Sequence, residues 1–183
     1  EIGVQSTNGE TIDAIHRHMD LDRLFHYVDR VHELGNIHQH LDLIAGLPYE
    51  NYERFGCSFD DLYAHEPDQL LKVLKGTMME EEVKKYSILY RNQPPYEVLG
   101  TKWLSYDEII LLKGVEELVE LYYNSGQYTL TLKYAVPFFE SPFRFYEMFS
   151  AWYRGKGYHK LNHNRLEKYN ILREFLREHI DEN

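Results

Sequence analysis

The chain has 183 residues, of which 43% are hydrophobic and 27% are charged, and its net charge is −10. This length suits one domain or one and a half, and an aromatic share of 15% excludes a disordered chain. The acidic balance argues against a general nucleic-acid binder, because phosphates require a basic stripe. No apolar run approaches the roughly 20 residues that span a bilayer, and no signal peptide opens the chain.

Cys57 is the only cysteine, which excludes an internal disulfide. The same count excludes an iron–sulfur cluster held by three or four thiolates of this chain. A reducing cytoplasm is therefore the compartment that we expect. We interpret Cys57 as a packed thiol within a helix rather than as a nucleophile.

The first 75 residues alternate between strand and helix patterns. The expected order is a strand at 2–5, a helix opened by a capping box from Thr7 to Glu10, a helix at 20–34, a strand at 37–45, a helix at 49–65 and a strand at 68–74. In the second strand, Leu41, Leu43 and Ala45 alternate with Asp42 and Ile44. This order predicts parallel strands joined by crossover helices, hence an α/β fold.

The pattern changes between residues 90 and 104, so we divide the chain into 1–90 and 91–183. Asn92 to Pro95 is a break, residues 96–99 form a short extended piece, and Ser105 to Glu108 is a second capping box. Helices are expected near 105–124, 129–138, 141–154 and 162–180, which makes the second region mainly helical. Its aromatic concentration between Phe138 and Tyr153 indicates a packed core or the lining of a substrate cavity.

Three parallel strands cannot close a barrel, because an eight-stranded barrel needs about 200 residues or more. The first strand would also expose unpaired backbone groups along its outer edge. The sequence therefore predicts an open, partial TIM-type barrel, a fragment whose missing N-terminal half is its main partner. Pairing of two such edges in a homodimer is a second expectation.

Three stretches in this order resemble the radical S-adenosylmethionine (SAM) superfamily. Glu1-Ile2-Gly3-Val4-Gln5-Ser6 is similar to its fourth barrel strand, Ile15-His16-Arg17-His18 to the helix segment after that strand, and Leu41-Asp42-Leu43-Ile44-Ala45-Gly46-Leu47-Pro48-Tyr49-Glu50 to its fifth strand and turn. Over roughly the first 75 residues the similarity is to oxygen-independent coproporphyrinogen oxidase. Leu71 to Thr77 resembles the sixth strand of the cobalamin-binding group. Pro94 to Leu99 and Tyr122 to Gly126 resemble an uncharacterised C-terminal domain of such proteins, some named after the anaerobic magnesium-protoporphyrin monomethyl ester cyclase.

The resemblance implies a set of SAM-binding residues, namely Gln5, Ser6, Arg17, Asp42, Ile44 and Gly46. Gln5 and Asp42, at strand ends, would accept hydrogen bonds from the ribose hydroxyls, and Arg17 would bind the methionyl carboxylate. The backbone from Ile44 to Gly46 would bind the adenine edge, with Ile44 packed on the ring and Gly46 allowing close approach. All of these lie at the carboxyl ends of strands, where α/β proteins bind ligands.

The resemblance also implies what this chain lacks. The C-x3-C-x2-C motif of the [4Fe–4S] cluster is absent, so no catalytic or metal-binding residue is assigned to this chain, and the fragment alone should be inactive. The parent protein would be an oxidoreductase or methyltransferase that cleaves SAM reductively with its cluster and acts on a small molecule. Cobalamin is a further candidate cofactor of that parent.

Other interpretations stay open at this point. Gln5 and Asp42 could cap strand ends, and Arg17 could be a solvated cation. The pairs His16/His18 and His38/His40 could look like metal ligands, but no third ligand stands nearby in the sequence, so surface or packing roles are expected. His159 and His163 have the i, i+4 spacing of a zinc-binding helix, but Lys160 stands where the metalloprotease motif has Glu. The alternative function is a non-catalytic helical interaction module on a structural α/β remnant, because the chain shows no nucleophile–base set.

Overall fold

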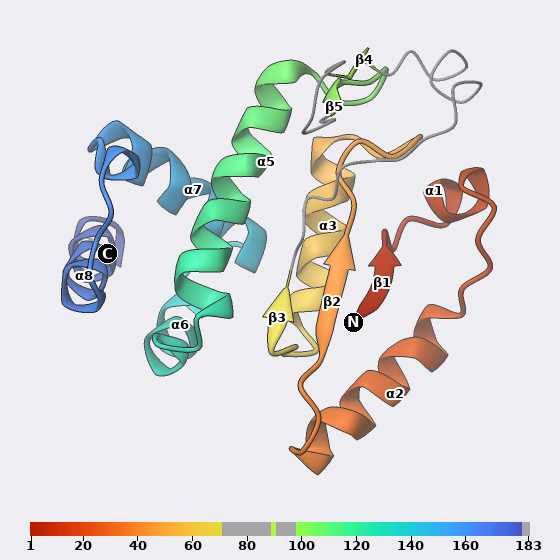
Figure 1. The fold of residues 1–183 in the computed structure, drawn as a ribbon, viewed down its shortest axis with the longest axis horizontal. Coiled ribbons are helices and arrows are strands. Elements are labelled where there is room, and N and C mark those ends of the chain that lie inside the picture. Colours follow the sequence, from red (N-terminus) through yellow and green to blue (C-terminus); the bar gives the residue numbers. More distant parts are fainter. Residues whose placement is uncertain (71–88, 91–97, 181–183) are drawn as a thin grey trace.

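The computed structural model describes residues 1–70, 89–90 and 98–180, and its first half contains a parallel sheet. The sheet has the order β1 (Ile2–Gln5), β2 (His40–Leu43) and β3 (Gln69–Leu70). Helices α1 (Gly9–Ala14) and α2 (Leu21–Leu34) connect β1 to β2, and α3 (Tyr52–Tyr63) connects β2 to β3 (Figure 1). The predicted α/β class with parallel strands and crossover helices is confirmed, and the described sheet is open.

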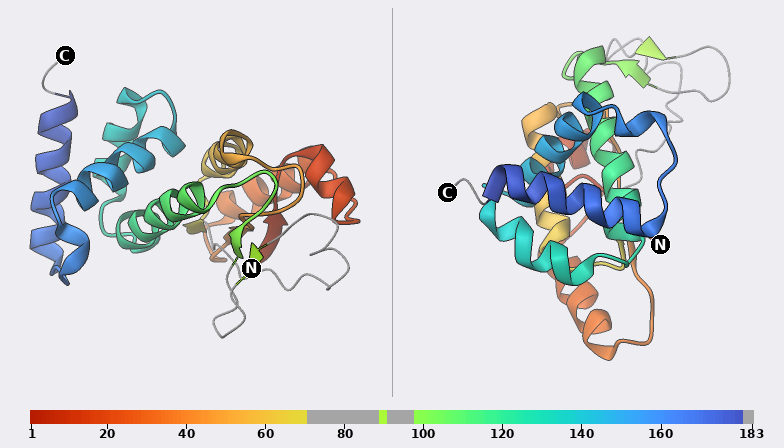
Figure 2. Two further views of the ribbon diagram at one scale, coloured as in Figure 1. Left: turned by 90° about the horizontal axis from the view of Figure 1, so that it is seen from above. Right: turned by 90° about the vertical axis from the view of Figure 1, so that its left-hand side faces the viewer.

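The second half is mainly helical, as predicted. A small antiparallel hairpin of β4 (Leu89–Tyr90) and β5 (Val98–Gly100) precedes it. The helices are α5 (Tyr106–Leu118), which continues as the π-helix η1 (Val119–Asn124), then α6 (Thr129–Ala135) with the 3₁₀ turn η2 (Val136–Phe138), α7 (Pro142–Gly155), the 3₁₀ turn η3 (Tyr158–Lys160) and α8 (Arg165–Ile180). Figure 2 shows these helices arranged outward from the sheet, with α8 farthest from the strands.

Local capping signals fix several helix ends. Asp20 accepts a hydrogen bond from the backbone N–H of Arg23 at the start of α2, and Gly35 ends that helix in a left-handed conformation. The capping box from Ser105 to Glu108 forms as predicted. The box predicted from Thr7 to Glu10 is wrong, because the Thr7 hydroxyl donates to Asp61 at 2.6 Å and α1 begins after Asn8.

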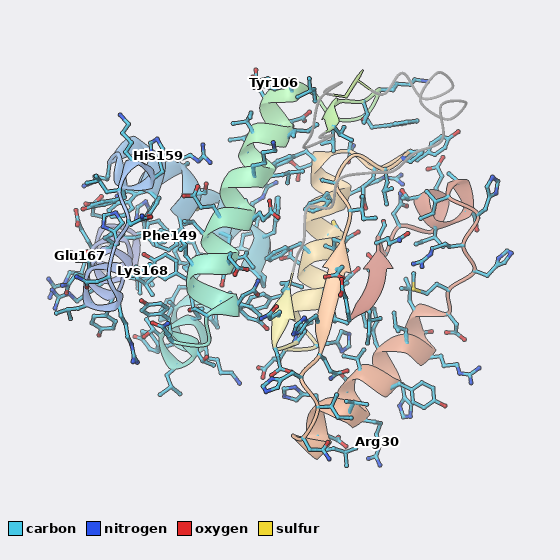
Figure 3. The ribbon with its side chains drawn as sticks, viewed as in Figure 1. Arg30, Tyr106, Phe149, His159, Glu167 and Lys168 are labelled. Carbon is cyan, nitrogen blue, oxygen red and sulfur yellow. The ribbon has the colours of Figure 1, made fainter. Side chains whose placement is uncertain are left out.

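One hydrophobic core runs through both halves of the chain. On α3, Phe55, Phe59 and Leu62 are fully buried, and the α7 residues Phe143 and Tyr146 pack against Phe59 with ring centroids 5.7 and 5.9 Å apart. Most of the aromatic concentration between residues 138 and 153 is core, although Phe138 is 57% exposed. Figure 3 shows Phe149 inside the helical part, whereas Tyr106 and His159 lie at its outside.

Asn124, the last residue of the π-helix, completes hydrogen bonding at Leu70, the last residue of β3. Its side-chain oxygen accepts from the Leu70 N–H at 2.9 Å, and its side-chain nitrogen donates to the Leu70 carbonyl at 3.1 Å. The amide therefore takes the place of a neighbouring strand at this residue. The outer edge of β1 has no such partner among the described residues.

Other predictions have mixed outcomes. Cys57 is exposed on α3, so its interpretation as a packed thiol is wrong; the buried stripe of that helix passes through its neighbours Gly56 and Ser58 instead. The 71–77 motif lies outside the described residues, and so does most of the 94–99 motif. Within the described part of the chain, no helix has the length and apolar character that crossing a bilayer requires.

The contact between α3 and α7 can be tested at Gly56. A Cβ added there would lie 2.7 to 3.2 Å from three ring atoms of Phe143, which is itself buried. We expect Gly56→Ala to destabilise the protein by about 1–3 kcal/mol, measured by urea unfolding. Gly155→Ala in α7 is the control, because nothing lies within 4 Å of its added Cβ, and it should be neutral or stabilising by up to about 1 kcal/mol. Equal effects would mean that the two helices are packed loosely.

Candidate functional site

The carboxyl ends of β1 and β2 form the upper edge of the sheet in Figure 1. Gly3 pairs with Asp42, and a register shift then places Gln5 beside Leu43. Gln5 has a φ of +71°, and its carbonyl accepts a hydrogen bond from the Ile44 N–H at 2.9 Å. A left-handed conformation costs a non-glycine residue about 1 kcal/mol or more, so neighbouring contacts must hold Gln5 in it.

Gln5 and Arg17 approach each other over Gly3. A Cβ built on Gly3 would lie 3.9 Å from Gln5 Nε2 and 4.0 Å from Arg17 Nη1. Arg17 Nη1 also donates to the Gly3 carbonyl at 2.5 Å. Asp42 is the strand neighbour of Gly3 and is 7% exposed. A guanidinium and an amide therefore both lie near one residue that has no side chain, and the strand neighbour of that residue carries a carboxylate.

Ser6, predicted at the cofactor site, is fully buried in a network around Glu50. The Ser6 hydroxyl donates to Glu50 Oε1 at 2.5 Å, and the Ser58 hydroxyl donates to the same oxygen at 3.1 Å. Burial raises the pKa of Glu50 to about 7, against the lowering effects of both hydrogen bonds and of the Arg54 charge. Glu50 ends the 41–50 motif, yet no role was predicted for it. The sequence feature that could have indicated a role is the position of this carboxylate directly after an apolar turn.

The turn after β2 is covered by the hairpin that begins the second half. Gly46 has a φ of +88°, and a Cβ on it would lie 3.2 Å from Val98 Cγ1 and 3.5 Å from Thr101 Cγ2. Close approach at Gly46, predicted for adenine, is therefore made by protein side chains on this side. Tyr49 stacks obliquely on Trp103, with ring centroids 4.8 Å apart.

Helix α1 holds the same turn from the other side. The Thr11 hydroxyl donates to the Pro48 carbonyl at 2.9 Å, and the Asn8 side chain donates to the Tyr49 carbonyl at 3.1 Å. Of the four non-glycine residues with positive φ among the described residues, three are at this edge: Gln5, His16 and Tyr49. Such strained residues concentrate at ligand sites, which makes the carboxyl edge the candidate site.

The arrangement can hold a polar ligand that carries both an anionic group and hydroxyls. The outward-lying Arg17 supplies cationic donors, Gln5 supplies an amide that both donates and accepts, and Asp42 supplies a carboxylate. Ile44 is half-buried and offers apolar surface beside them. Of the six residues predicted for the site, Gln5 and Arg17 lie near Gly3 and Asp42 pairs with Gly3 in the sheet, while Ser6 and Gly46 face protein neighbours.

Within the described residues, no group of three or more His, Cys, Asp or Glu side chains could hold a metal ion. His159 and His163 do not share an α-helix, because a 3₁₀ turn ends at Lys160 between them. His163 Nε2 instead lies 2.9 Å from the Tyr158 carbonyl.

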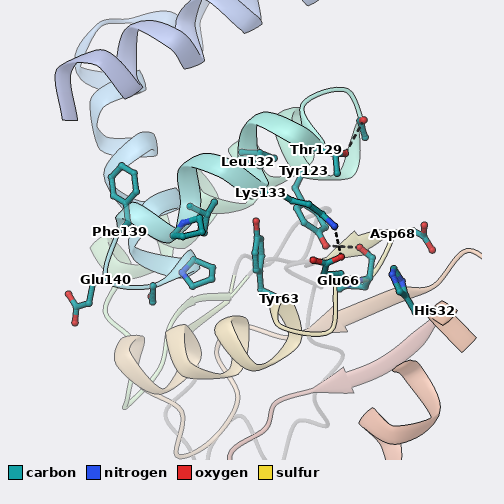
Figure 4. Close-up of a pocket in the computed structure, with 16 residues that line it drawn as sticks. His32, Tyr63, Glu66, Asp68, Tyr123, Thr129, Leu132, Lys133, Phe139 and Glu140 are labelled. Atoms are coloured by element: carbon teal, nitrogen blue, oxygen red, sulfur yellow. Dashed lines mark hydrogen bonds and ion pairs between the residues drawn. The ribbon is translucent and has the colours of Figure 1, made fainter. Parts of the chain in front are cut away.

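A cavity of about 780 Å³ lies at the opposite, amino-terminal end of the strands, and the sequence did not predict it (Figure 4). Lys133 and Glu66 form an ion pair of 2.7 Å there, and the Tyr123 hydroxyl donates to the Pro67 carbonyl at 2.7 Å. Its lining combines the α3 end, α6 and the start of α7: His32, Tyr63, Glu66, Pro67, Asp68, Tyr123, Gly126, Thr129, Leu132, Lys133, Val136, Pro137, Phe139, Glu140, Ser141 and Pro142. None of these residues belongs to the set predicted at the carboxyl ends of the strands, where α/β proteins bind ligands. The cavity is therefore separate from the candidate site.

Two comparisons relate the chain to known proteins. A family model described as "Protein of unknown function (DUF4080)" matches residues 84–183, which is 100 of the 183 residues. Oxygen-independent coproporphyrinogen-III oxidase-like protein HemZ of Bacillus subtilis (strain 168) is 31% identical over 106 residues. That stretch covers 57% of this chain but only 20% of HemZ. The predicted relationship to the coproporphyrinogen oxidase group is thus confirmed as a distant similarity, while the cobalamin and cyclase relationships stay predictions.

The contact between the Gly46 turn and the hairpin gives a prediction. Gly46→Ala should destabilise the protein by about 1–3 kcal/mol, because Ala strains a left-handed backbone and also meets Val98. Gly126→Ala is the matched control, with a φ of +65° and nothing within 4 Å of the added Cβ. Adding Val98→Ala to Gly46→Ala should recover part of the loss in thermal unfolding. No recovery would mean that Val98 does not press on the turn.

The buried Glu50 carboxyl gives a pH dependence. Because its folded-state pKa, about 7, lies above its usual 4.5, the protonated form is favoured on folding. Its stabilising contribution, on the order of 3 kcal/mol, is full below about pH 4.5 and is lost as pH rises through 7. Glu50→Gln should therefore show a flatter fall in unfolding free energy between pH 5 and 8 than the wild type.

The control for that measurement is Glu33→Gln, since Glu33 lies at the surface in an ion pair with Arg30. This variant should keep the wild-type pH slope. If Glu50→Gln also keeps that slope, Glu50 titrates like a solvated carboxylate.

Proposed function

We propose, from the premise that this chain belongs to the DUF4080 family, that it is part of a radical SAM iron–sulfur oxidoreductase or methyltransferase and contributes one side of the SAM site. The observation that carries the proposal is the meeting of Gln5 and Arg17 over Gly3, beside Asp42. The similarity to HemZ, named as coproporphyrinogen-III oxidase-like, supports the same class.

The donor set suits SAM chemically. Arg17 would bind the carboxylate of the methionyl group, and Asp42 and Gln5 would accept from the ribose hydroxyls. Ile44 would pack on the adenine. When bound, SAM supplies a sulfonium whose reductive cleavage starts the reaction. The residues of this chain would bind and orient it at the sheet edge.

The [4Fe–4S] cluster does not fit this chain. Cys57 is its one cysteine and is exposed on α3, and a cluster needs three or more thiolates. We therefore propose that the cluster ligands lie outside these 183 residues, and that the 183-residue chain is inactive alone. Cobalamin, a small-molecule substrate and the exact reaction belong to the whole protein.

The surface around β1 supports a partner that completes the sheet. In α2 only Val28 is buried, whereas Leu21, Leu24 and Phe25 are half-buried and Leu34 is 65% exposed. An amphipathic helix with a half-covered apolar face beside an open strand edge could pack against a further strand and helix. We propose that the missing half of the barrel supplies them; pairing of two β1 edges in a homodimer would cover the same surface.

A helical interaction module is the second candidate function. Leu130, Tyr134 and Phe138 are spaced four residues apart along α6 and η2, and they are 86%, 68% and 57% exposed. Such an apolar stripe is typical of a protein-contact surface. It would coexist with the SAM site if both belong to one larger protein.

The test uses this chain together with the coding sequence upstream of it, with the cluster rebuilt under anaerobic conditions. SAM binding, measured by equilibrium dialysis, should weaken about tenfold or more in Arg17→Gln and in Asp42→Asn, since each loses a charge-assisted hydrogen bond.

The control is Arg23→Gln, at an exposed residue on α2, which should bind SAM like the wild type. Absence of a three-cysteine motif upstream, or SAM binding unchanged in both site variants, would overturn the proposal.

A further inference from the structure

The hydrogen bonds among Glu50, Ser6 and Ser58 fix the position of the segment that directly follows Gln5. Besides donating to Glu50, the Ser6 side chain accepts a hydrogen bond from the Asn8 N–H at 3.0 Å. The Thr7 N–H donates to the Ser58 hydroxyl at 3.1 Å. The residues that follow β1 are thus tied to α3 and to the turn before it, through Ser58 and Glu50.

Glu50 acts through one of its two carboxyl oxygens. Oε1 accepts from both Ser6 and Ser58, whereas Oε2 is buried without a hydrogen-bond partner among the described residues. An apolar side chain of similar size would remove the unpaired Oε2, but it would also take away the acceptor of the buried Ser6 and Ser58 hydroxyls. The structural role of Glu50 therefore depends on Oε1 as a hydrogen-bond acceptor, and Ser6 is the nearer of its two donors.

Ser6 is bonded directly to the residue whose backbone is strained. Gln5 has a φ of +71°, and its Nε2 lies 3.9 Å from the Cβ position of Gly3, from which Arg17 Nη1 is 4.0 Å away. If Ser6 were free to move, Gln5 would relax to an extended conformation, in which side chains alternate between faces.

We propose that Glu50 is a positioning residue, which holds Gln5 in its left-handed conformation through Ser6 and so directs the Gln5 amide toward Gly3 and Arg17. For the ligand itself this rests on the proposed function, because Gln5 is the group that would contact SAM. The geometric part concerns this chain alone.

The geometric part is tested by NMR on the 183-residue chain. In the wild type, the backbone shifts of Gln5 should report a left-handed conformation, and its side-chain amide should give a nuclear Overhauser effect to the Gly3 α-protons. Ser6→Ala and Glu50→Leu should lose both signals. Glu50→Gln should keep them, because Gln retains an acceptor oxygen for Ser6 and Ser58.

Asp61→Asn is the matched control, because the hydrogen bond between Asp61 and this turn, within the part of the chain that the structure describes, comes from the Thr7 hydroxyl. It should keep both signals. Ser6→Ala removes a single hydroxyl and decides the outcome even if Glu50→Leu does not fold. Both signals persisting in a folded Ser6→Ala would overturn the positioning role.

SAM binding by the upstream-extended protein separates this inference from the proposed function. Ser6→Ala should weaken SAM binding about tenfold, with Glu50→Gln near the wild type. If the wild type binds no SAM while Ser6→Ala still loses its NMR signals, the proposed function fails and the positioning role stands. If SAM binds equally well to the wild type and to Ser6→Ala with the signals intact, the positioning role fails.

Discussion

Helix α3 is packed on both sides, by the parallel sheet and by α7, and the rest of the molecule takes its place from that helix. Phe55, Phe59 and Leu62 are fully buried in the shared core. The helix also forms polar links in both directions. Midway along it, Ser58 donates to Glu50 near the strand ends, and two residues later Asp60 accepts from the Phe143 N–H at 2.6 Å. A displacement of α3 would therefore change the candidate site and the DUF4080 region together.

Through this shared packing, the described part of the DUF4080 region (residues 84–183) belongs to the same hydrophobic core as the first half of the chain. Asn124 completes hydrogen bonding at Leu70, and Val98 and Thr101 fill the space over Gly46. The end of η1 thus bonds to the last residue of β3, while the hairpin covers the turn after β2. The opposite side, along β1, stays open among the described residues, and the half-covered apolar face of α2 lies beside it.

The two ends of the sheet differ in physical character. The carboxyl end concentrates backbone strain, at Gln5, His16 and Tyr49, together with a buried carboxyl of raised pKa. The amino end holds a mainly apolar cavity, with the Lys133–Glu66 ion pair at its side. Strain and buried charge cost stability and persist only where surrounding contacts hold them. For that reason the carboxyl end, rather than the cavity at the amino end, is the candidate site.

The sequence by itself determined the order of strands and helices, the parallel pairing and the change to a helical region, because periodicity and caps such as Asp20 and Ser105 act over a few residues. Its resemblance to the radical SAM superfamily also implied Gln5, Arg17 and Asp42 as candidates. Only the tertiary structure decided that Ser6 is bound by Glu50, that Gly46 meets Val98, that Thr7 turns to Asp61 instead of capping α1, and that Cys57 faces outward. These outcomes depend on partners 40 to 55 residues away or on the direction in which a helix buries its stripe, and local patterns carry no information about either.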